Sequence, residues 1–258
     1  MNILCIGDIV GTPGCRQLMD KLPKLRRDKQ IDVVIANGEN AADGNGITPT
    51  TAKHIFDSGV DVITLGNHTY RRAEFYDYLD GADNVIRPAN FPKGAPGKGF
   101  CTVDLGRTQI CVINMIGQSF IDSFDSPFDC IDGILSDTSL PKVKILDFHA
   151  EATGEKKALA YYLDGRISAM FGTHTHVQTA DECFLPKGLA YITDVGMTGT
   201  VNSVLGVKSE LVIKKLKTKL PVRFDYEQEG PCRMDCVMFT CDEKTGRCTK
   251  IERISIKK

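Results

Sequence analysis

The sequence lacks the marks of a membrane, exported or nucleic-acid-coating protein. No stretch of about 18 residues is both apolar and uncharged, so we expect no membrane-spanning helix. The first predicted strand begins at Asn2, and no basic segment precedes it that could open a signal peptide. The 32 Lys and Arg residues nearly balance the 33 Asp and Glu residues, which argues against a protein that coats nucleic acid or a membrane surface. We therefore expect a cytoplasmic protein.

Internal repeats, low-complexity segments and linkers rich in Pro, Gly or Ser are also missing, so nothing divides the chain into separate units. Hydrophobic residues (42%) and charged residues (25%) are present in the proportions of an ordinary globular protein. A chain of 258 residues is long enough to bury a full core. We expect one domain that spans residues 1–258.

The ten cysteines lack the close C-x2-C pairs that are usual in structural zinc sites. The four nearest the C-terminus have the spacing C-x3-C-x4-C-x6-C; they are Cys232, Cys236, Cys241 and Cys248. A zinc knuckle is therefore the less favoured interpretation of this cluster. Because no export signal is present, a disulfide framework is not expected either. We predict reduced cysteines on C-terminal strands.

Strand and helix patterns alternate along the first two-thirds of the chain, which favours right-handed crossovers and a largely parallel sheet. Apolar residues at helical spacing predict helices over 14–27, 48–56, 71–79, 155–162 and 209–217. Residues 109–115 are a predicted strand, and 126–139 are helical or rich in loops. Residues 222–226, 234–241 and 250–256 are typical of an antiparallel meander. This ending suggests a second sheet packed on the first.

Five short apolar runs each lead into residues that can bind a metal. Runs this short, rich in Val and Ile, predict buried strands. The runs and the polar residues that follow them are 3–6 with Asp8, 33–36 with Glu39 and Asn40, 62–65 with Asn67 and His68, 143–148 with His149, and 167–171 with His174 and His176. Because ligands bind at the carboxyl ends of strands in open α/β sheets, we expect these side chains to meet at one rim.

Taken singly, most of these residues have a structural alternative. Asp8 could cap a helix, and Glu39 and Asn40 lie in a cluster that is typical of a turn. His68 and His149, each considered alone, are more typical of histidines that make structural hydrogen bonds.

His174 and His176 differ from the other candidates, because side chains two residues apart on a strand point to the same side. Two imidazoles on one side need a partner, and a metal ion is the simplest one. His54 lies on a predicted helix away from any strand end and is interpreted as a surface or structural histidine.

Together the candidates indicate a metal centre with nitrogen and oxygen ligands and no thiolate. Such ligands suit manganese or iron, with zinc as a third candidate. Seven ligands are too many for one four-coordinate ion and suit two ions that share a bridging carboxylate.

The motifs resemble those of the calcineurin-like metallophosphoesterases. Two positions depart from the superfamily pattern: Val10 replaces its first histidine ligand and Glu39 replaces its bridging aspartate. With these departures the chain is similar to the YmdB-like phosphodiesterases along essentially its whole length. The phrases that carry this resemblance are residues 6–11, 37–42, 66–69, 87–92, 147–153, 172–181, 193–199 and 250–254.

The resemblance implies a role for each candidate residue. One metal ion would be held by Asp8, Asn40 and His176, with Asn40 in place of the missing histidine. The other ion would be held by Asn67, His149 and His174, and Glu39 would bridge the two ions. His68 would stay off the metals and donate a proton. The implied fold is an α/β fold in which a β-sandwich of two sheets is flanked by helices in αββα layers.

The resemblance also implies an activity: hydrolysis of phosphodiesters, with 2′,3′-cyclic nucleotides as substrates and iron or manganese as cofactors. A hydroxide that bridges the metals would attack phosphorus in line, and His68 would protonate the leaving alkoxide. Two divalent ions facing two carboxylates and a hydroxide keep one positive charge. A diester anion neutralises this charge, whereas a monoester dianion overshoots it, so the charge count favours diesters.

Two other classes of protein remain open from the sequence. One is a regulatory protein that uses the metals to bind a phosphate-bearing signal or an RNA end, but an intact His68 favours catalysis, since binding alone needs no proton donor. The other is a different metal hydrolase, such as an amidohydrolase, which the paired Gly-Asn-His and Gly-x-His-x-His motifs disfavour. Assembly into a homo-oligomer is left open.

Two weaker features lie near the predicted rim. The glycine-rich loop 94–99 is not a Walker A motif, because no Ser or Thr follows Lys98; a plain loop with Lys98 near the substrate is one interpretation. Asp194 follows a predicted strand, and either orients a histidine ligand or belongs to a turn.

Overall fold

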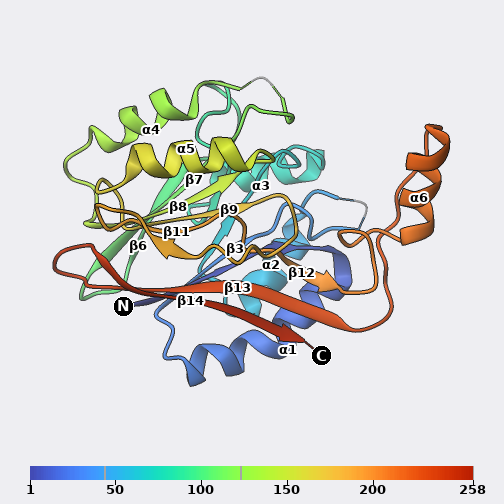
Figure 1. The fold of residues 1–258 in the computed structure, drawn as a ribbon, viewed down its shortest axis with the longest axis horizontal. Helices are drawn as coiled ribbons and strands as arrows, with labels where there is room; N and C mark the ends of the chain where they lie inside the picture. The colour runs from blue at the N-terminus through green and yellow to red at the C-terminus, as the bar shows by residue number, and fades with distance from the viewer. Residues whose placement is uncertain (44, 123, 258) are drawn as a thin grey trace.

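The computed structural model describes residues 1–43, 45–122 and 124–257, which form two β-sheets packed face to face with helices on both outer sides (Figure 1). The first sheet has the strand order β2-β12-β13-β1-β3-β4-β5, with β14 paired to β13. Its strands are β1 (Asn2–Ile6), β2 (Asp8–Ile9), β3 (Val33–Asn37), β4 (Val62–Thr64), β5 (Val85–Ile86), β12 (Met197–Thr200), β13 (Cys232–Cys241) and β14 (Cys248–Lys257).

The second sheet has the order β10-β11-β9-β8-β7-β6. Its strands are β6 (Phe100–Asp104), β7 (Gln109–Ile116), β8 (Val143–His149), β9 (Ala169–Thr173), β10 (Cys183–Phe184) and β11 (Ala190–Ile192). The helices are α1 (Gly11–Asp28), α2 (Pro49–Asp57), η1 (Ala73–Phe75, a 3₁₀ turn), α3 (Tyr76–Gly81), α4 (Pro127–Leu135), α5 (Thr153–Leu163) and α6 (Ser209–Thr218).

Alternation along β1 shows how the layers form. Leu4 and Ile6 pack in a cluster with residues of α1 and α2, whereas Ile3 and Cys5 pack against apolar residues of the second sheet. Successive side chains of a strand point to opposite faces, so one strand contributes to two cores. A third cluster joins the other face of the second sheet to α4 and α5. The predicted αββα arrangement is therefore observed.

Parallel pairing brings the carboxyl ends of the central strands to one edge of each sheet. In the first sheet β1, β3, β4 and β5 are parallel, with Ile6 opposite Ala36 and Asn37 opposite Thr64. In the second sheet β7, β8, β9 and β11 are parallel, with His149 opposite Thr173. The segments that follow these strands carry the predicted site residues.

The predicted helices are present, with small changes at their ends. Thr48 caps α2, because its hydroxyl accepts a hydrogen bond from the Thr51 amide while the Thr51 hydroxyl bonds the Thr48 amide. The helix predicted over 71–79 begins later, as η1 followed by α3. Among the described residues, no helix is both long enough and apolar enough to cross a membrane.

Our prediction for the C-terminal strands was wrong in two respects. The second sheet comes from the middle of the chain, whereas β13 and β14 extend the first sheet, with β13 antiparallel beside β1. Residues 222–226 contribute only an isolated bridge between Tyr226 and Val207. Strand β13 is buried on both faces, with Val237 and Phe239 between the sheets, so its apolar pattern fits a central strand of either sheet.

The prediction that the C-terminal cysteines are all reduced was also wrong. Cys241 and Cys248 lie opposite each other on β13 and β14 and form a disulfide. Cys232 and Cys236 are free, as expected. The spacing alone does not reveal this pairing, because it depends on the register of the hairpin.

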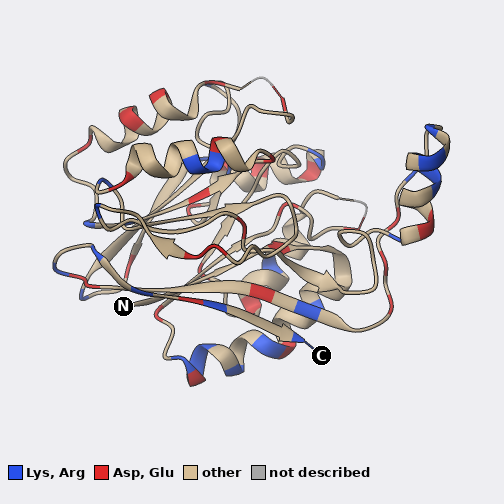
Figure 2. Ribbon diagram, in the orientation of Figure 1, with Lys and Arg blue, Asp and Glu red and all other residues tan. Residues whose placement is uncertain are grey.

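Helix α6 is arranged differently from the other helices. It stands away from both sheets (Figure 1) and none of its described side chains is buried. Lys residues lie along it (Figure 2).

Candidate metal centre

All eight predicted site residues lie together where the two sheets meet. The first sheet and the loops after its strands supply five of them, and the second sheet supplies the three histidines at the ends of β8 and β9. From the first sheet come Asp8, Glu39, Asn40, Asn67 and His68, and from the second come His149, His174 and His176. Hydrogen bonds and ion pairs between these side chains join them into one network, described below.

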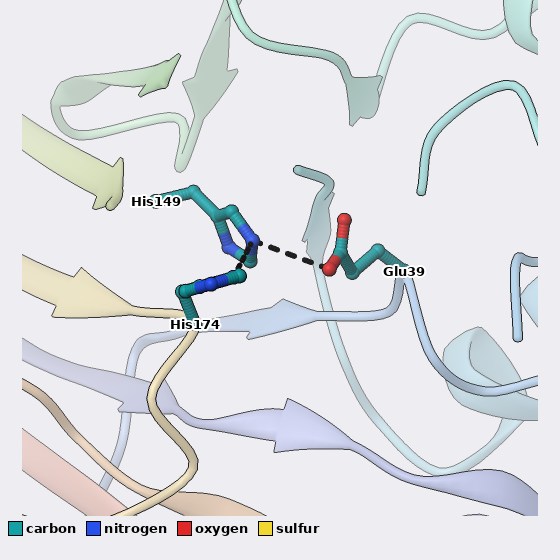
Figure 3. A group of neighbouring side chains, drawn as sticks. All are labelled: Glu39, His149 and His174. Carbon is teal, nitrogen blue, oxygen red and sulfur yellow. Dashed lines mark hydrogen bonds and ion pairs between the residues drawn. The ribbon is translucent and has the colours of Figure 1, made fainter. Parts of the chain in front are cut away.

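His149 lies at the centre of the first group of contacts (Figure 3). Its Nε2 is 3.2 Å from Oε1 of Glu39, 3.0 Å from Nδ1 of His174 and 2.9 Å from Oδ1 of Asn67. Ligand atoms of Glu39, His149 and His174 all lie within 4.8 Å of one another. Four potential ligand atoms thus converge within the reach of a single cation.

The second group of contacts surrounds Asp8. Its Oδ1 lies 3.5 Å from Nε2 of His176, and its Oδ2 accepts a hydrogen bond from the backbone N–H of His174 at 3.1 Å. Nδ2 of Asn40 lies 3.4 Å from both Nε2 of His176 and Oε1 of Glu39. Glu39 therefore touches both groups, which is the position expected of a bridging residue.

Each of the three clustered histidines presents one ring nitrogen to the site and anchors the other. His149 Nδ1 is 2.9 Å from the hydroxyl of Thr173, which in turn donates to the buried carboxylate of Asp147 at 2.8 Å. Such outer contacts fix the ring orientation and tautomer of histidines that ligate metals.

The other two rings follow the same pattern. His174 turns Nδ1 to the site and pairs Nε2 with Oε2 of Glu151 at 3.1 Å. His176 turns Nε2 to Asp8 and its Nδ1 donates to the Leu205 carbonyl at 3.0 Å.

Several polar atoms in this cluster lack a hydrogen-bond partner or face an atom of the same kind, and a cation would satisfy them. Oδ1 of Asp8 is fully buried and accepts no hydrogen bond from the described residues. The facing nitrogens of His149 and His174 can both be satisfied only by a shared proton or by a cation. The residues therefore fit a metal centre of nitrogen and oxygen donors.

Asn40 can act as a metal ligand only after its side-chain amide rotates. Its Oδ1 accepts hydrogen bonds from His68 Nδ1 at 2.9 Å and Tyr226 Oη at 3.3 Å, so its amide nitrogen faces His176. An amide nitrogen cannot ligate a metal. Ligation by Asn40 would require rotation about χ2, which exchanges the two amide atoms.

The surroundings shift the pKa values of His149 and His174 in opposite directions. Burial acts to lower the pKa of His149, but the charges of Glu39 and Asp8 raise this pKa to about 9. Burial and the charge on His149 lower the pKa of His174 to about 4. The two pKa values move apart because the rings lie close together, and a positive charge on one ring disfavours a positive charge on the other.

The carboxylates respond in the opposite direction. Burial acts to raise the pKa of Glu39 and Asp8, but the neighbouring histidine charges and hydrogen bonds outweigh burial and lower both pKa values. Burial lowers the pKa of His68, although the charge of Glu39 opposes this effect. Both carboxylates are therefore ionised in the deepest part of the site.

The loop that carries His174 and His176 has a strained backbone. His174 has φ 100° and His176 has φ 62°, both in the left-handed region that non-glycine residues rarely adopt. Each such residue costs on the order of 1–3 kcal/mol and persists only when its surroundings hold it. This strain aims both rings at the site.

A buried ion pair holds that loop from behind. The ammonium of Lys156 on α5 lies 2.8 Å from Oδ2 of Asp194 and donates to the Thr173 carbonyl at 2.9 Å. The same Asp194 oxygen accepts from the Thr175 amide at 3.1 Å. Lys156 and Asp194 are both fully buried. Asp194 thus orients the histidine loop through its backbone and not through a histidine ring.

A cavity of about 430 Å³ opens over the cluster. Its lining includes His68, His174 and His176, together with the apolar or aromatic residues Leu205, Val207, Phe224 and Tyr226. Gly66 packs against the His149 ring so closely that a Cβ atom on it would come within 2.4 Å of the ring. The Gly-Asn-His motif therefore needs its glycine so that His149 can approach.

Some residues of the site were missed by our interpretation of the sequence. Tyr226 lies in a segment that we predicted to be a strand, and its contact with Asn40 depends on a distant fold-back. Asp147 and Glu151 flank His149 within the motif at 147–153, and a carboxylate inside an apolar strand was a signal for Asp147.

Two residues that we weighed lie outside the cavity. Lys98 forms an ion pair with the exposed Asp83 and borders a different hollow, so it does not line this site. His54 is exposed on α2, as expected.

The buried ion pair leads to a prediction about stability. Lys156→Met removes the cation and leaves Asp194 buried without it, which should lower the free energy of unfolding by about 3–5 kcal/mol. Its neighbour Lys157 is half exposed and lies 3.9 Å from Asp181. The matched Lys157→Met change should cost less than about 1 kcal/mol. Urea denaturation of both variants measures the difference. Equal losses in the free energy of unfolding would contradict a structural role for the Lys156–Asp194 pair.

Known proteins are similar to this chain along almost its whole length. The family model described as "YmdB-like protein" matches residues 4–254. A protein of Bacillus subtilis (strain 168), named 2′,3′-cyclic-nucleotide 2′-phosphodiesterase, is 48% identical over 257 residues, which cover 99% of this chain and 97% of the relative.

Solved structures give the same result for the fold. The structure of a hypothetical protein from Thermus thermophilus has a TM-score of 0.94 and is 40% identical, covering 100% of this chain and 99% of the other. A phosphatase from Mycoplasma pneumoniae has a TM-score of 0.94 at 31% identity, covering 100% and 93%. The metallophosphoesterase fold expected from the sequence is confirmed. The chain belongs to the YmdB-like family.

Proposed function

We propose that this chain is a metal-dependent phosphodiesterase that hydrolyses small phosphodiesters, 2′,3′-cyclic nucleotides above all. The observation that carries the proposal is the cluster of ionised carboxylates, amides and anchored histidines beneath a cavity large enough for a small molecule. The name of the Bacillus subtilis relative supports the choice of reaction and substrate.

The contacts support a division of the ligands between two metal ions, and the nitrogen and oxygen donors suit iron or manganese. Asn67, His149 and His174 would hold one ion, since their ligand atoms already face one another. Asp8, Asn40 and His176 would hold the other, after rotation of the Asn40 amide. Glu39, in contact with both groups, would bridge them.

When bound, two such ions supply Lewis acidity to the phosphoryl oxygens and lower the pKa of water enough to make a nucleophile at neutral pH. Asp8 and Glu39 offset only part of the positive charge of the ions. The remaining charge matches a diester anion better than a monoester dianion, because uncompensated charge is costly in a cleft shielded from water.

His68 is placed to act on the substrate. Its backbone amide donates to Oε2 of Glu39 at 2.8 Å, and its ring Nδ1 lies 2.9 Å from Oδ1 of Asn40. These contacts orient a ring that lines the cavity, and no described residue hydrogen-bonds its Nε2. We assign to His68 the transfer of a proton to the leaving alkoxide. The negative charge of a bound diester would favour the protonated ring and offset the effect of burial on its pKa.

The first prediction for this function concerns metal content. Protein purified without chelator should contain about two transition-metal ions per chain. Glu39→Ala should lose both ions, since Glu39 touches both groups, whereas His149→Ala should lose mainly one. His54→Ala, a change at the exposed histidine of α2, is the control and should retain both. Elemental analysis measures these values, and full activity with one ion or fewer would refute the binuclear assignment.

The second prediction concerns the substrate. Turnover of bis-p-nitrophenyl phosphate and 2′,3′-cyclic AMP should exceed turnover of p-nitrophenyl phosphate at the same metal loading, because of the charge balance described above. An amide substrate tests for a different hydrolase. Faster monoester hydrolysis would contradict the proposal, and binding of the cyclic nucleotide without turnover would indicate a regulatory binding protein.

The third prediction separates His68 from the ligands. His68→Ala should keep both metals while kcat falls by about 10²- to 10⁴-fold for a ribose leaving group, as expected for loss of a general acid. The loss should be smaller for p-nitrophenolate, which leaves without protonation. Comparing kcat for the two substrates tests the role. An equal loss would indicate that His68 stabilises phosphoryl charge instead, and loss of a metal would make it a ligand.

A further inference from the structure

A second hollow, which we call the Arg71 hollow, borders the proposed metal centre. Its volume is about 470 Å³, close to the 430 Å³ of the cavity described above. The residues of its lining that bear on its chemistry are Asn67, Tyr70, Arg71, Phe91, Asp122 and Phe124. Asn67 is a proposed metal ligand, and the next residue, His68, lines the first cavity. Both spaces have the size of small-molecule sites. A free nucleotide carries one base and needs one of them, so the Arg71 hollow is left for a further part of the substrate.

Aromatic rings give the Arg71 hollow a surface that suits a nucleobase. Phe91 and Phe124 are stacked, with ring centroids 4.7 Å apart and planes inclined by 19°, and the Tyr70 ring lies 5.6 Å from Phe91. Phe91 is buried, whereas Phe124 and Tyr70 are partly exposed and can offer area to a ligand. Proteins bind the unstacked bases of single-stranded RNA by stacking them on such side chains.

Arg71 adds a positive charge beside these rings. Its backbone amide donates to the His68 carbonyl at 3.1 Å, which closes the turn that begins at Asn67. Its side chain is exposed, and no described residue forms a hydrogen bond or an ion pair with the guanidinium. Exposed arginines are common, but this one lines a hollow next to a proposed phosphodiester site, and a guanidinium binds two phosphate oxygens at once. The carboxylate of Asp122 in the same lining suits the hydroxyl groups of a ribose.

The end of an RNA strand has the chemistry that these features need. When a strand ends in a 2′,3′-cyclic phosphate, its last ribose carries the cyclic diester and, on the 5′ side, the phosphate that leads to the preceding nucleotide. A second phosphate and a second base therefore lie one ribose away from the reacting phosphorus. A single arginine in a chain of net charge −1 suits contact with one such phosphate and not with a long strand.

We propose that the Arg71 hollow binds the penultimate nucleotide of an RNA strand that ends in a 2′,3′-cyclic phosphate. Arg71 binds the phosphate that joins the last two nucleotides, and Phe124 stacks on the penultimate base. This inference rests on the proposed function and changes its preferred substrate from a free cyclic nucleotide to a strand end. Water adds a hydroxyl group to the cyclic phosphorus, the bond to the ribose 2′ oxygen breaks, and that oxygen takes a proton, so the product is a strand with a 3′-phosphate.

Kinetics with three matched substrates test the proposal. The dinucleotide adenylyl-adenosine 2′,3′-cyclic phosphate carries the added phosphate and base, adenosine 5′-phosphate 2′,3′-cyclic phosphate carries only the added phosphate, and 2′,3′-cyclic AMP carries neither. For wild type, kcat/KM should be about tenfold higher for the dinucleotide than for 2′,3′-cyclic AMP, mainly through a lower KM. Equal values would overturn the proposal. Equal values for the dinucleotide and the 5′-phosphate would overturn the role of Phe124.

Variants test which side chains cause this preference, measured as the ratio of the two kcat/KM values. Arg71→Gln should bring the ratio close to one, and Arg71→Lys, which keeps the charge, should retain part of the preference. Phe124→Leu should remove the part that is due to the base. Arg27→Gln removes a charge from an exposed position of α1 that lines neither hollow, and should keep the wild-type ratio. The same ratio in Arg71→Gln as in Arg27→Gln would overturn the assignment.

Binding of reaction products separates this inference from the proposed function, because it requires no turnover. In isothermal titration calorimetry, the adenine dinucleotide with a 3′-phosphate should bind wild type about tenfold more tightly than 3′-AMP. Arg71→Gln should abolish this difference, and Arg27→Gln should keep it. Equal affinities of wild type for the two products would overturn the role of the Arg71 hollow. Failure of wild type to hydrolyse any of the three cyclic phosphates, with the difference in affinity intact, would overturn only the proposed function.

Discussion

The burial of two ionised carboxylates is the constraint on which the site depends. Asp8 and Glu39 are almost completely buried, and a carboxylate in the interior remains charged only beside compensating positive charge. In the chain alone, the charge of Asp8 raises the pKa of His176 and the charges of Glu39 and Asp8 raise that of His149, which favours the protonated form of both rings. The arrangement of the surrounding strands serves to bring histidines from the second sheet to carboxylates from the first.

The loop that carries His174 and His176 is also held in place by contacts outside the site. Strain in the loop of His174 and His176 would relax if nothing opposed it, and the Lys156–Asp194 pair opposes it from the side away from the cavity. Buried ion pairs contribute little net stability compared with apolar packing, because desolvation cancels most of the attraction. Their value here is geometric, since the charged oxygen of Asp194 accepts a hydrogen bond from the Thr175 amide between the two histidines.

The positions of the site residues could be predicted from the sequence because each follows a short buried strand. Asp8, Glu39, Asn67, His149 and His174 come from five strands, and parallel pairing brings the ends of such strands together. The assignment of the last two strands failed for a related reason. Strand β13 is apolar on both faces, and that pattern does not state which sheet it joins. Two features could not be predicted from the sequence. The disulfide depends on the register of the β13–β14 hairpin, and the contact of Tyr226 with Asn40 joins segments that are far apart in the chain.

The site contains residues from both sheets, and buried side-chain hydrogen bonds also join the two sheets. The Thr64 hydroxyl at the end of β4 donates to Asp147 on β8 at 2.5 Å. The side-chain amide of Asn114 on β7 donates to the carbonyls of Leu65 and Ile86 at 2.7 and 3.0 Å. In the proposed metal centre, ligands from both sheets would make a bound ion a further cross-link between the two layers. Any ligand that binds only the native state stabilises it by mass action. Metal binding at the proposed centre would therefore add to the resistance of this protein to unfolding and proteolysis, besides its proposed role in catalysis.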